Sequence, residues 1–242
     1  SMTNATVDNI AKTIEPCGLV IFDSHGTTDY SGSNSDYTSR ANSSYLCLTT
    51  NTGITSTDYN NGWAVSSGSA AYIDGRYIQN HISGTLSNCL VWMAICEGMK
   101  SNGYGTTGTA LLAAGAGCVY GYSQSVSFTG DYEYEEHFWN NMKYNDYTVA
   151  EAFDAMTAAL GNWDPAYSSS SGSAWPIVMS PDDPFPSNPD SHQTVNCDWK
   201  LFGGSMDPIA LESWSLSAEA VDVIVGNTNT VTFNRIPDEV LR

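Results

Sequence analysis

The stretch that most constrains the fold spans residues 90–123, where the pattern predicts a strand, a loop, a helix and a second strand. Leu90–Ile95 is a continuous apolar run, typical of a strand buried on both faces of a parallel sheet. Thr107–Ala114 predicts a short helix, and Cys118–Tyr122 predicts the next strand. This βαβ order places Cys96 at the carboxyl end of its first strand, the edge where ligands bind in open α/β sheets.

A second apolar run, Gly18–Asp23, predicts another buried strand, and Ser24, His25 and Gly26 follow it directly. If the two strands are parallel neighbours, His25 and Cys96 emerge at the same edge of the sheet. A thiol and an imidazole suffice for nucleophilic catalysis, because the histidine assists formation of the thiolate that attacks a carbonyl. Gly26 lets the backbone approach a reacting group, which makes its N–H a candidate oxyanion donor.

These motifs carry a resemblance to a known family. An apolar strand ending in His-Gly, followed by one ending in Cys, resembles the caspase-like (clan CD) cysteine peptidases, which include gingipains, clostripain, legumains, separases and CHAT-domain proteins. Residues 95–98 (ICEG) are similar to the Ala-Cys-Glu-Ser-Gly of legumains and CHAT domains, without the Ser. Residues 108–123 look like the helix and strand after the nucleophile in CHAT and gingipain domains. Residues 198–208 look like a loosened form of the LFGDP segment of gingipain-type domains.

The resemblance covers roughly residues 15–210 and implies a three-layer α/β fold with a mostly parallel central sheet. It implies a cysteine endopeptidase in which Cys96 attacks the scissile carbonyl and His25 protonates the leaving amine. The backbone N–H groups of Gly26 and Cys96 would hold the oxyanion. The expected substrate is a protein or peptide.

Substrate specificity is less well defined. In the resembling families the residue two before the nucleophile lines the primary pocket, and that residue is Ala94 here. Specificity for Arg or Lys would then need an acid from elsewhere, such as Asp29, Asp36 or the loop 182–183, and a small or apolar P1 residue is equally consistent. The candidates for further substrate-binding walls are Tyr122 and Ser123.

Charge limits the classes of partner. The formal net charge is −18, from 26 acidic and 8 basic residues, which argues against nucleic acid and anionic membrane surfaces. No apolar run is long enough to span a bilayer. The abundance of Ser, Thr, Asn, Gly and Tyr with little Lys is typical of an extracellular or cell-surface bacterial protein. Caspase-like sheets usually have strands before the His-Gly strand, so we expect an upstream fragment of the same precursor as a partner.

The six cysteines lie far apart in the sequence and show no CxxC or Cys/His metal spacing, so no metal site or cofactor is expected. Calcium stays open because of the acidic loops, although no EF-hand-like loop is present. We expect mostly free thiols, and a disulfide involving Cys47 or Cys197 stays open if the protein is secreted.

Residues 1–211 are expected to form the catalytic domain, and residues 212–242 read as strands, either the start of an Ig-like module or strands that pack back on the domain. Elsewhere the pattern predicts helices at 131–143 and 149–160, with Thr148 and Glu151 as a capping box for the second. Asp74-Gly75 predicts a hairpin between strands at 71–73 and 77–79, and residues 161–192 predict a long loop.

A rival hypothesis is a carbohydrate-binding or adhesive extracellular module, which the many Tyr, Trp, Ser, Thr and Asn residues would suit. A second rival is a degenerate caspase-like domain kept as a protein-binding scaffold. Both predict an inert Cys96. The reactivity of the Cys96 thiol, with His25 in reach, therefore separates them from the peptidase.

Overall fold

A computed structural model of the chain describes part of its length, in twelve ranges. The described residues are 7–15, 17–27, 44–48, 53–67, 70–86, 88–99, 107–162, 164, 175–181, 197–201, 214–215 and 234–235. The protein has a mixed α/β fold built on a mostly parallel four-stranded sheet, which agrees with the α/β class expected from the sequence.

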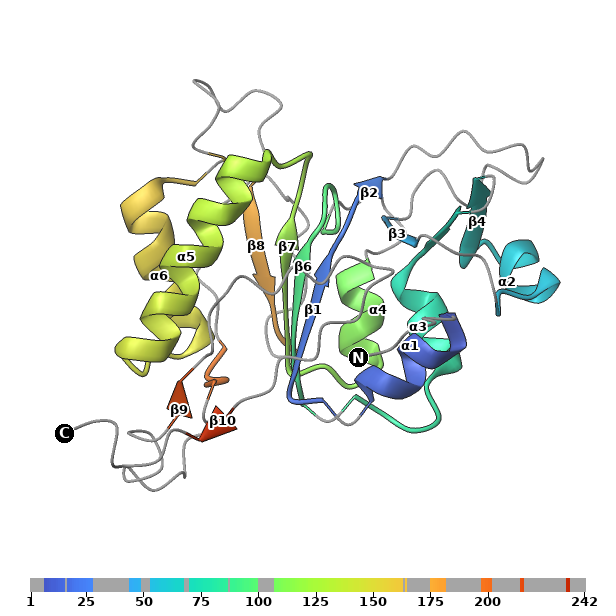
Figure 1. Ribbon diagram of the computed structural model, residues 1–242, viewed down its shortest axis with the longest axis horizontal. Coiled ribbons are helices and arrows are strands. Elements are labelled where there is room, and N and C mark those ends of the chain that lie inside the picture. Colours follow the sequence, from blue (N-terminus) through green and yellow to red (C-terminus); the bar gives the residue numbers. More distant parts are fainter. Residues whose placement is uncertain are drawn as a thin grey trace.

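The central sheet has the order β1-β6-β7-β8, with helices on both of its faces (Figure 1). Its strands are β1 (Leu19–Asp23), β6 (Leu90–Ala94), β7 (Cys118–Tyr122) and β8 (Pro176–Met179). β6 pairs in parallel with both β1 and β7, whereas β8 is antiparallel to β7. The βαβ unit predicted around residues 90–123 is therefore confirmed, and the predicted strand at 118–122 has the observed bounds.

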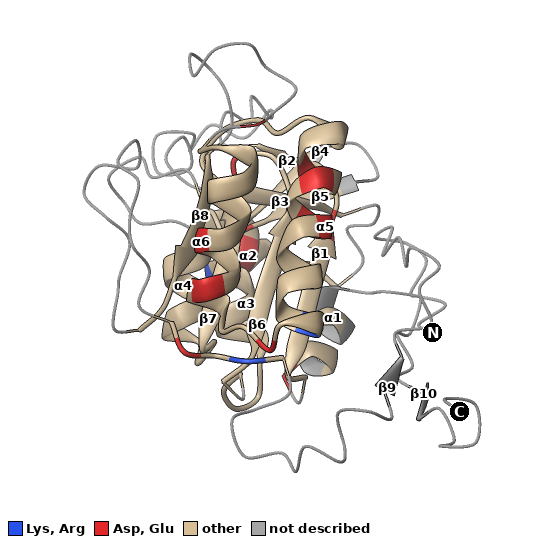
Figure 2. Cartoon of the chain, turned by 90° about the vertical axis from the view of Figure 1, so that its left-hand side faces the viewer, with Lys and Arg blue, Asp and Glu red and all other residues tan. Residues whose placement is uncertain are grey.

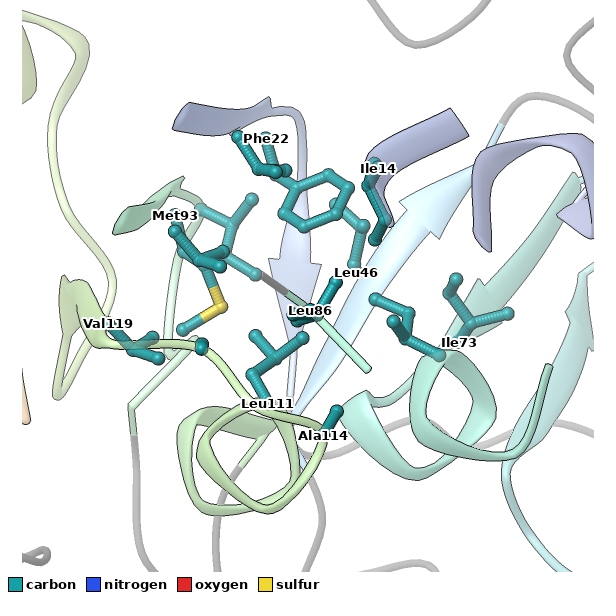
Figure 3. Close-up of a cluster of buried hydrophobic side chains, with 14 of the residues drawn as sticks. Ile14, Phe22, Leu46, Ile73, Leu86, Met93, Leu111, Ala114 and Val119 are labelled. Carbon is teal, nitrogen blue, oxygen red and sulfur yellow. The ribbon is translucent and has the colours of Figure 1, made fainter. Parts of the chain in front are cut away.

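Both faces of the sheet are buried, in two separate apolar clusters. Along β6, Val91 and Met93 join one cluster with α1 (Val7–Ile14), α3 (Gly75–His81) and α4 (Thr107–Ala113). Figure 3 shows the mainly aliphatic side chains of this cluster, with Met93 and Val119 of the sheet near Leu111 and Ala114. The continuous apolar pattern of the strand follows from this double burial.

The other face of the sheet is covered by α5 (Phe128–Tyr144) and α6 (Val149–Leu160), at the left of Figure 1. The cluster there is rich in aromatic rings, and Trp92 stacks on Tyr120 with ring centroids 3.5 Å apart. The predicted Thr148–Glu151 capping box is confirmed, because each side chain accepts from the other residue's backbone N–H. α5 begins three residues earlier than predicted, because Ser127 caps it by accepting from the N–H of Gly130.

A second, antiparallel sheet has the order β2-β3-β5-β4. Its strands are β2 (Gly26–Thr27), β3 (Tyr45–Leu48), β4 (Ala64–Ser67) and β5 (Ala70–Ile73). A short helix, α2 (Ser56–Asn60), precedes β4. Only two residues, Ser24 and His25, lie between the end of β1 in the central sheet and the start of β2 in the second sheet.

The hairpin predicted at Asp74-Gly75 is wrong. The residues after Asp74 form helix α3, because the Asp74 carboxylate accepts from the N–H groups of Arg76 and Tyr77 and so caps a helix. The hairpin of this region joins β4 to β5 instead.

The loop predicted at 161–192 also needs correction, because it contains β8. Four apolar residues opening with a proline fit an edge strand, where a missing N–H is tolerated. In the C-terminal part, Trp214–Ser215 (β9) pairs antiparallel with Asn234–Arg235 (β10), and the rest of the region 212–242 that was predicted to form strands lies outside the described residues. None of the described helices is both long and apolar enough to cross a membrane.

Candidate functional site

His25 occupies the junction between the two sheets, and its backbone is held by β3. The His25 carbonyl accepts from the N–H of Cys47 at 2.8 Å, and the Ser24 hydroxyl donates to the Cys47 carbonyl at 2.8 Å. The side chain of His25 is exposed. A fixed backbone with an exposed imidazole is the arrangement that a proton-transferring histidine needs.

Cys96 lies just beyond the carboxyl end of β6, after the fully buried Ile95. Its side chain is half-buried, and its thiol contacts the backbone carbonyl of Val126 with a sulfur-to-oxygen distance of 3.7 Å. The next residue, Glu97, has a φ of 61°, in the left-handed region that non-glycine residues seldom adopt. Its N–H donates to the Gln124 carbonyl at 2.9 Å. Strained turns of this kind cluster at functional sites.

The pairing of β1 with β6 brings His25 and Cys96 to the same level of the sheet. The register pairs Leu19 with Leu90 and runs to Asp23 with Ala94. Two further residues along each strand reach His25 and Cys96. The expectation that both emerge at one edge of a parallel pair is therefore confirmed as a matter of topology.

Gly26 packs directly on the backbone of Cys96. A Cβ atom at position 26 would collide with the Cys96 carbonyl oxygen and lie 3.1 Å from the Cβ of Ile95, so any larger residue forces the two segments apart. The sequence expectation of a close backbone approach at Gly26 agrees with this contact. The loop that carries His25 is thus seated against the turn that carries Cys96.

The three expected substrate-binding residues are all buried. Ala94 is 5 % exposed and Ser123 is 2 % exposed, and the Ser123 hydroxyl accepts from the N–H of Trp175 at 3.1 Å. Tyr122 is fully buried, and its hydroxyl donates to Asp131 at 2.7 Å. Their side chains face the protein interior in this structure, so a substrate pocket at these residues stays a prediction.

Asp131 is a residue that the sequence analysis missed. It lies in the first turn of α5, and burial raises the pKa of its carboxyl group to about 6, with further increases from the nearby Asp23 and Asp164 and a decrease from the Tyr122 hydroxyl. The signal was present, because Asp131 precedes Tyr134 by three residues and Phe138 by seven, which places it on the buried face of the helix. Asp131 accepts from Tyr122, the last residue of β7, so this carboxyl group with a raised pKa lies at the same edge of the sheet as His25 and Cys96.

The other histidines lie elsewhere. The Nε2 atom of His81 is 2.8 Å from the Asp58 carboxylate, and its ring stacks on Tyr77 with centroids 3.9 Å apart. His137 lies in α5, and its carbonyl accepts from the Asn141 side chain. His192 lies outside the described residues. The contacts of His81 with Asp58 and Tyr77 fit a structural role.

No set of three or more His, Cys, Asp or Glu side chains that could hold a metal ion occurs within the described ranges. Of the acids weighed for specificity, positions 29, 36, 182 and 183 lie outside those ranges. A scan against models of protein families found no match for this chain, and a search of curated proteins found no relative.

Proposed function

We propose that the protein is a caspase-like cysteine endopeptidase with Cys96 as nucleophile and His25 as its proton-transfer partner. The observation that supports this most is the parallel register of β1 and β6, which brings these two residues level at the carboxyl edge of the sheet. The seating of Gly26 on the Cys96 backbone adds to it, because it fixes the imidazole-bearing loop relative to the thiol-bearing turn.

The reaction is an acyl transfer. The Cys96 sulfur attacks the scissile carbonyl carbon, and the backbone N–H groups of Gly26 and Cys96 stabilise the oxyanion. His25 protonates the leaving amine, and water then hydrolyses the thioester to release the acid product. The attack requires the Cys96 thiol to give up its proton, and His25 accepts that proton before it protonates the leaving amine.

The surroundings of Ala94 suggest which substrates to test first. Asp23 is the register partner of Ala94, and Asp131 lies close enough to Asp23 for the two carboxylates to interact. Peptides with a basic residue at P1 come first, and peptides with a small or apolar P1 residue come second. In this proposal the enzyme acts outside the cell or at its surface, with residues 1–211 as the catalytic domain.

The test measures the reactivity of each thiol. Iodoacetamide labelling from pH 5 to 9, mapped by mass spectrometry, gives the rate for all six cysteines in the wild type and in His25→Ala. We expect fast labelling confined to Cys96 in the wild type and slower labelling of Cys96 in His25→Ala, because the imidazole no longer assists formation of the thiolate. His137→Ala is the matched control, since His137 lies on α5, and should leave the profile unchanged.

Cleavage of a proteome-derived peptide library completes the test. Products should appear with the wild type and disappear with Cys96→Ala and His25→Ala. If Cys96 labels no faster than the half-buried Cys47 and no peptide is cleaved, the peptidase proposal is wrong. Binding of glycans or proteins would then be measured, as a carbohydrate-binding module or a degenerate scaffold requires.

A further inference from the structure

Four of the six cysteines belong to the end of the central sheet opposite Cys96. Cys17 and Cys89 precede the first residues of β1 and β6, and Cys118 opens β7. Cys197 joins Cys118 in the aromatic-rich cluster under α5 and α6. A strand rises about 3.3 Å per residue, so the length of β6 separates this end from Cys96 by roughly 20 Å.

Cys118 and Cys197 pack in the same buried cluster, with 0 % and 6 % of their surfaces exposed. Their side chains lie close enough for each thiol to shift the pKa of the other. The half-buried thiols of Cys17 and Cys96 face backbone carbonyl groups instead, those of Thr13 and Val126. Two thiols that neighbour each other in one buried cluster can form a disulfide with little movement of the backbone.

The backbone around Cys197 is fixed to the rest of the fold. Its carbonyl accepts from the N–H of Ala150 at 3.1 Å, and the Trp199 carbonyl accepts from Val149 at 2.9 Å, both in the first turn of α6. The Trp199 indole N–H donates to the Asn88 carbonyl at 2.8 Å. Residues 197–201, which we call the α6 strap, therefore hold Cys197 in place beside β7.

The two sulfurs differ in how readily they ionise. The hydrogen bond from Cys118 lowers the pKa of Cys197, in opposition to burial. Burial raises the pKa of Cys118 well above its ordinary range. Cys197 is accordingly the sulfur that ionises first and acts as the nucleophile towards an oxidant.

We propose that Cys118 and Cys197 form a reversible disulfide that ties the α6 strap to β7 when the protein meets a disulfide oxidant such as glutathione disulfide. The Cys197 thiolate attacks one sulfur of the oxidant, the oxidant's S–S bond breaks, and one glutathione leaves as its thiol after taking up a proton. Cys118 then loses its proton and attacks the Cys197 sulfur, which releases the second glutathione. The two cysteines lose two electrons and two protons, and the oxidant gains them.

The disulfide would close a long loop that contains α5, α6 and β8. Cross-links across long loops restrict the unfolded chain most, and we expect the melting temperature to rise by about 5–10 °C on oxidation. Because both sulfurs are almost fully buried, their oxidation should be slower than the labelling of Cys96, and it requires a brief opening of the α6 strap.

The experiment treats the full chain with glutathione disulfide, blocks remaining thiols with N-ethylmaleimide and digests without reduction. Mass spectrometry should identify a peptide pair linked through Cys118 and Cys197, and dithiothreitol should remove it together with the gain in melting temperature. Cys197→Ser should lose both. Cys96→Ser should keep both, which separates this inference from the peptidase proposal.

Two results would overturn the inference. One is oxidised wild-type protein in which Cys118 is recovered wholly as the maleimide adduct, or is linked mainly to another cysteine such as Cys89. The other is a gain in melting temperature that is equal in Cys197→Ser. The mass-spectrometric result is measured on the wild type, so it stands even where a serine variant folds poorly.

Discussion

The neighbourhoods of His25 and His81 show what separates a histidine suited to chemistry from one that holds structure together. His25 is exposed, and its surroundings fix its backbone while leaving its ring at the surface. His81 has its ring stacked on Tyr77 and its Nε2 against the buried carboxylate of Asp58. The first arrangement leaves the imidazole accessible at the surface, and the second uses the ring for packing and as a hydrogen-bond partner.

The aspartates of the two neighbourhoods differ in the same way. Asp58 is buried, which would raise its pKa, but hydrogen bonds from His81 and Thr55 lower the pKa on balance. Burial raises the pKa of Asp131 to about 6. The nearby carboxylates raise this pKa further, and the hydrogen bond from the Tyr122 hydroxyl lowers it only in part. Hydrogen bonds therefore offset the effect of burial on the pKa of Asp58, whereas they do not offset it for Asp131, at the edge of the sheet near Cys96. Figure 2 shows further acidic residues along α5 and α6.

The largest expected effect is a loss of activity, and it should differ between two glycines that flank β1, Gly26 and Gly18. Gly26→Ala should reduce kcat/KM for peptide cleavage about 100-fold, because its Cβ displaces the Cys96 carbonyl and a shift near 1 Å suffices for such a loss. Gly18→Ala is the matched control, since a Cβ there meets nothing within 4 Å. Equal activities of the two variants in the library assay would contradict the seating of His25 on Cys96.

The second prediction concerns the structural pair. Asp58→Ala should lower the free energy of unfolding by about 3 kcal/mol, because it removes a buried carboxylate that pairs with His81 and caps α2 through Thr55. The labelling profile of Cys96 should stay that of the wild type. Urea denaturation gives the stability, and Asp154→Ala, at an exposed position of α6, serves as the control. A stable Asp58→Ala protein with slowed Cys96 labelling would mean that the two neighbourhoods are coupled.

The smallest effect is a change in pH dependence at Asp131. Its folded pKa of about 6 lies above the ordinary value of 3.8, so its contribution to stability is full below pH 4 and is lost as the pH rises through 6. Asp131→Asn removes this loss, and we expect the variant to gain about 1–2 kcal/mol over the wild type between pH 4 and pH 7. Chemical denaturation across that range measures it, with Asp154→Asn as control. A constant difference between variant and wild type would show that Asp131 does not titrate there.

The sequence predicted the elements whose signals are local. The strand at 118–122 and the capping box at Thr148 followed from runs of apolar residues and a short motif. Asp74 was misassigned because Asp-Gly also opens hairpins, and only the positions of the Arg76 and Tyr77 N–H groups distinguish a helix cap. The strand β8 is too short to stand out from a loop, and it is ordered by its pairing with β7.

The site was predicted in part for the same reason. His25 and Cys96 each follow an apolar run, and such runs are visible in the sequence. That the two residues lie level with each other was seen only from the register between β1 and β6. The helical spacing places Asp131 on a buried face, but its bond to Tyr122 and the proximity of Cys118 to Cys197 join residues from separate elements, and no local pattern encodes such contacts. Apart from α3 and β8, what escaped the sequence was the set of long-range neighbours.

The parallel pairing of β1 with β6 also has a consequence for the order of folding. All of the second sheet, with α2 and α3, lies in the chain between these two partners. Contacts between residues far apart in sequence form slowly, because the entropy of closing the intervening loop is lost before the contact stabilises it. We expect the hairpin β4–β5 to form early and the β1–β6 ladder late, so that His25 and Cys96 come together only near the end of folding.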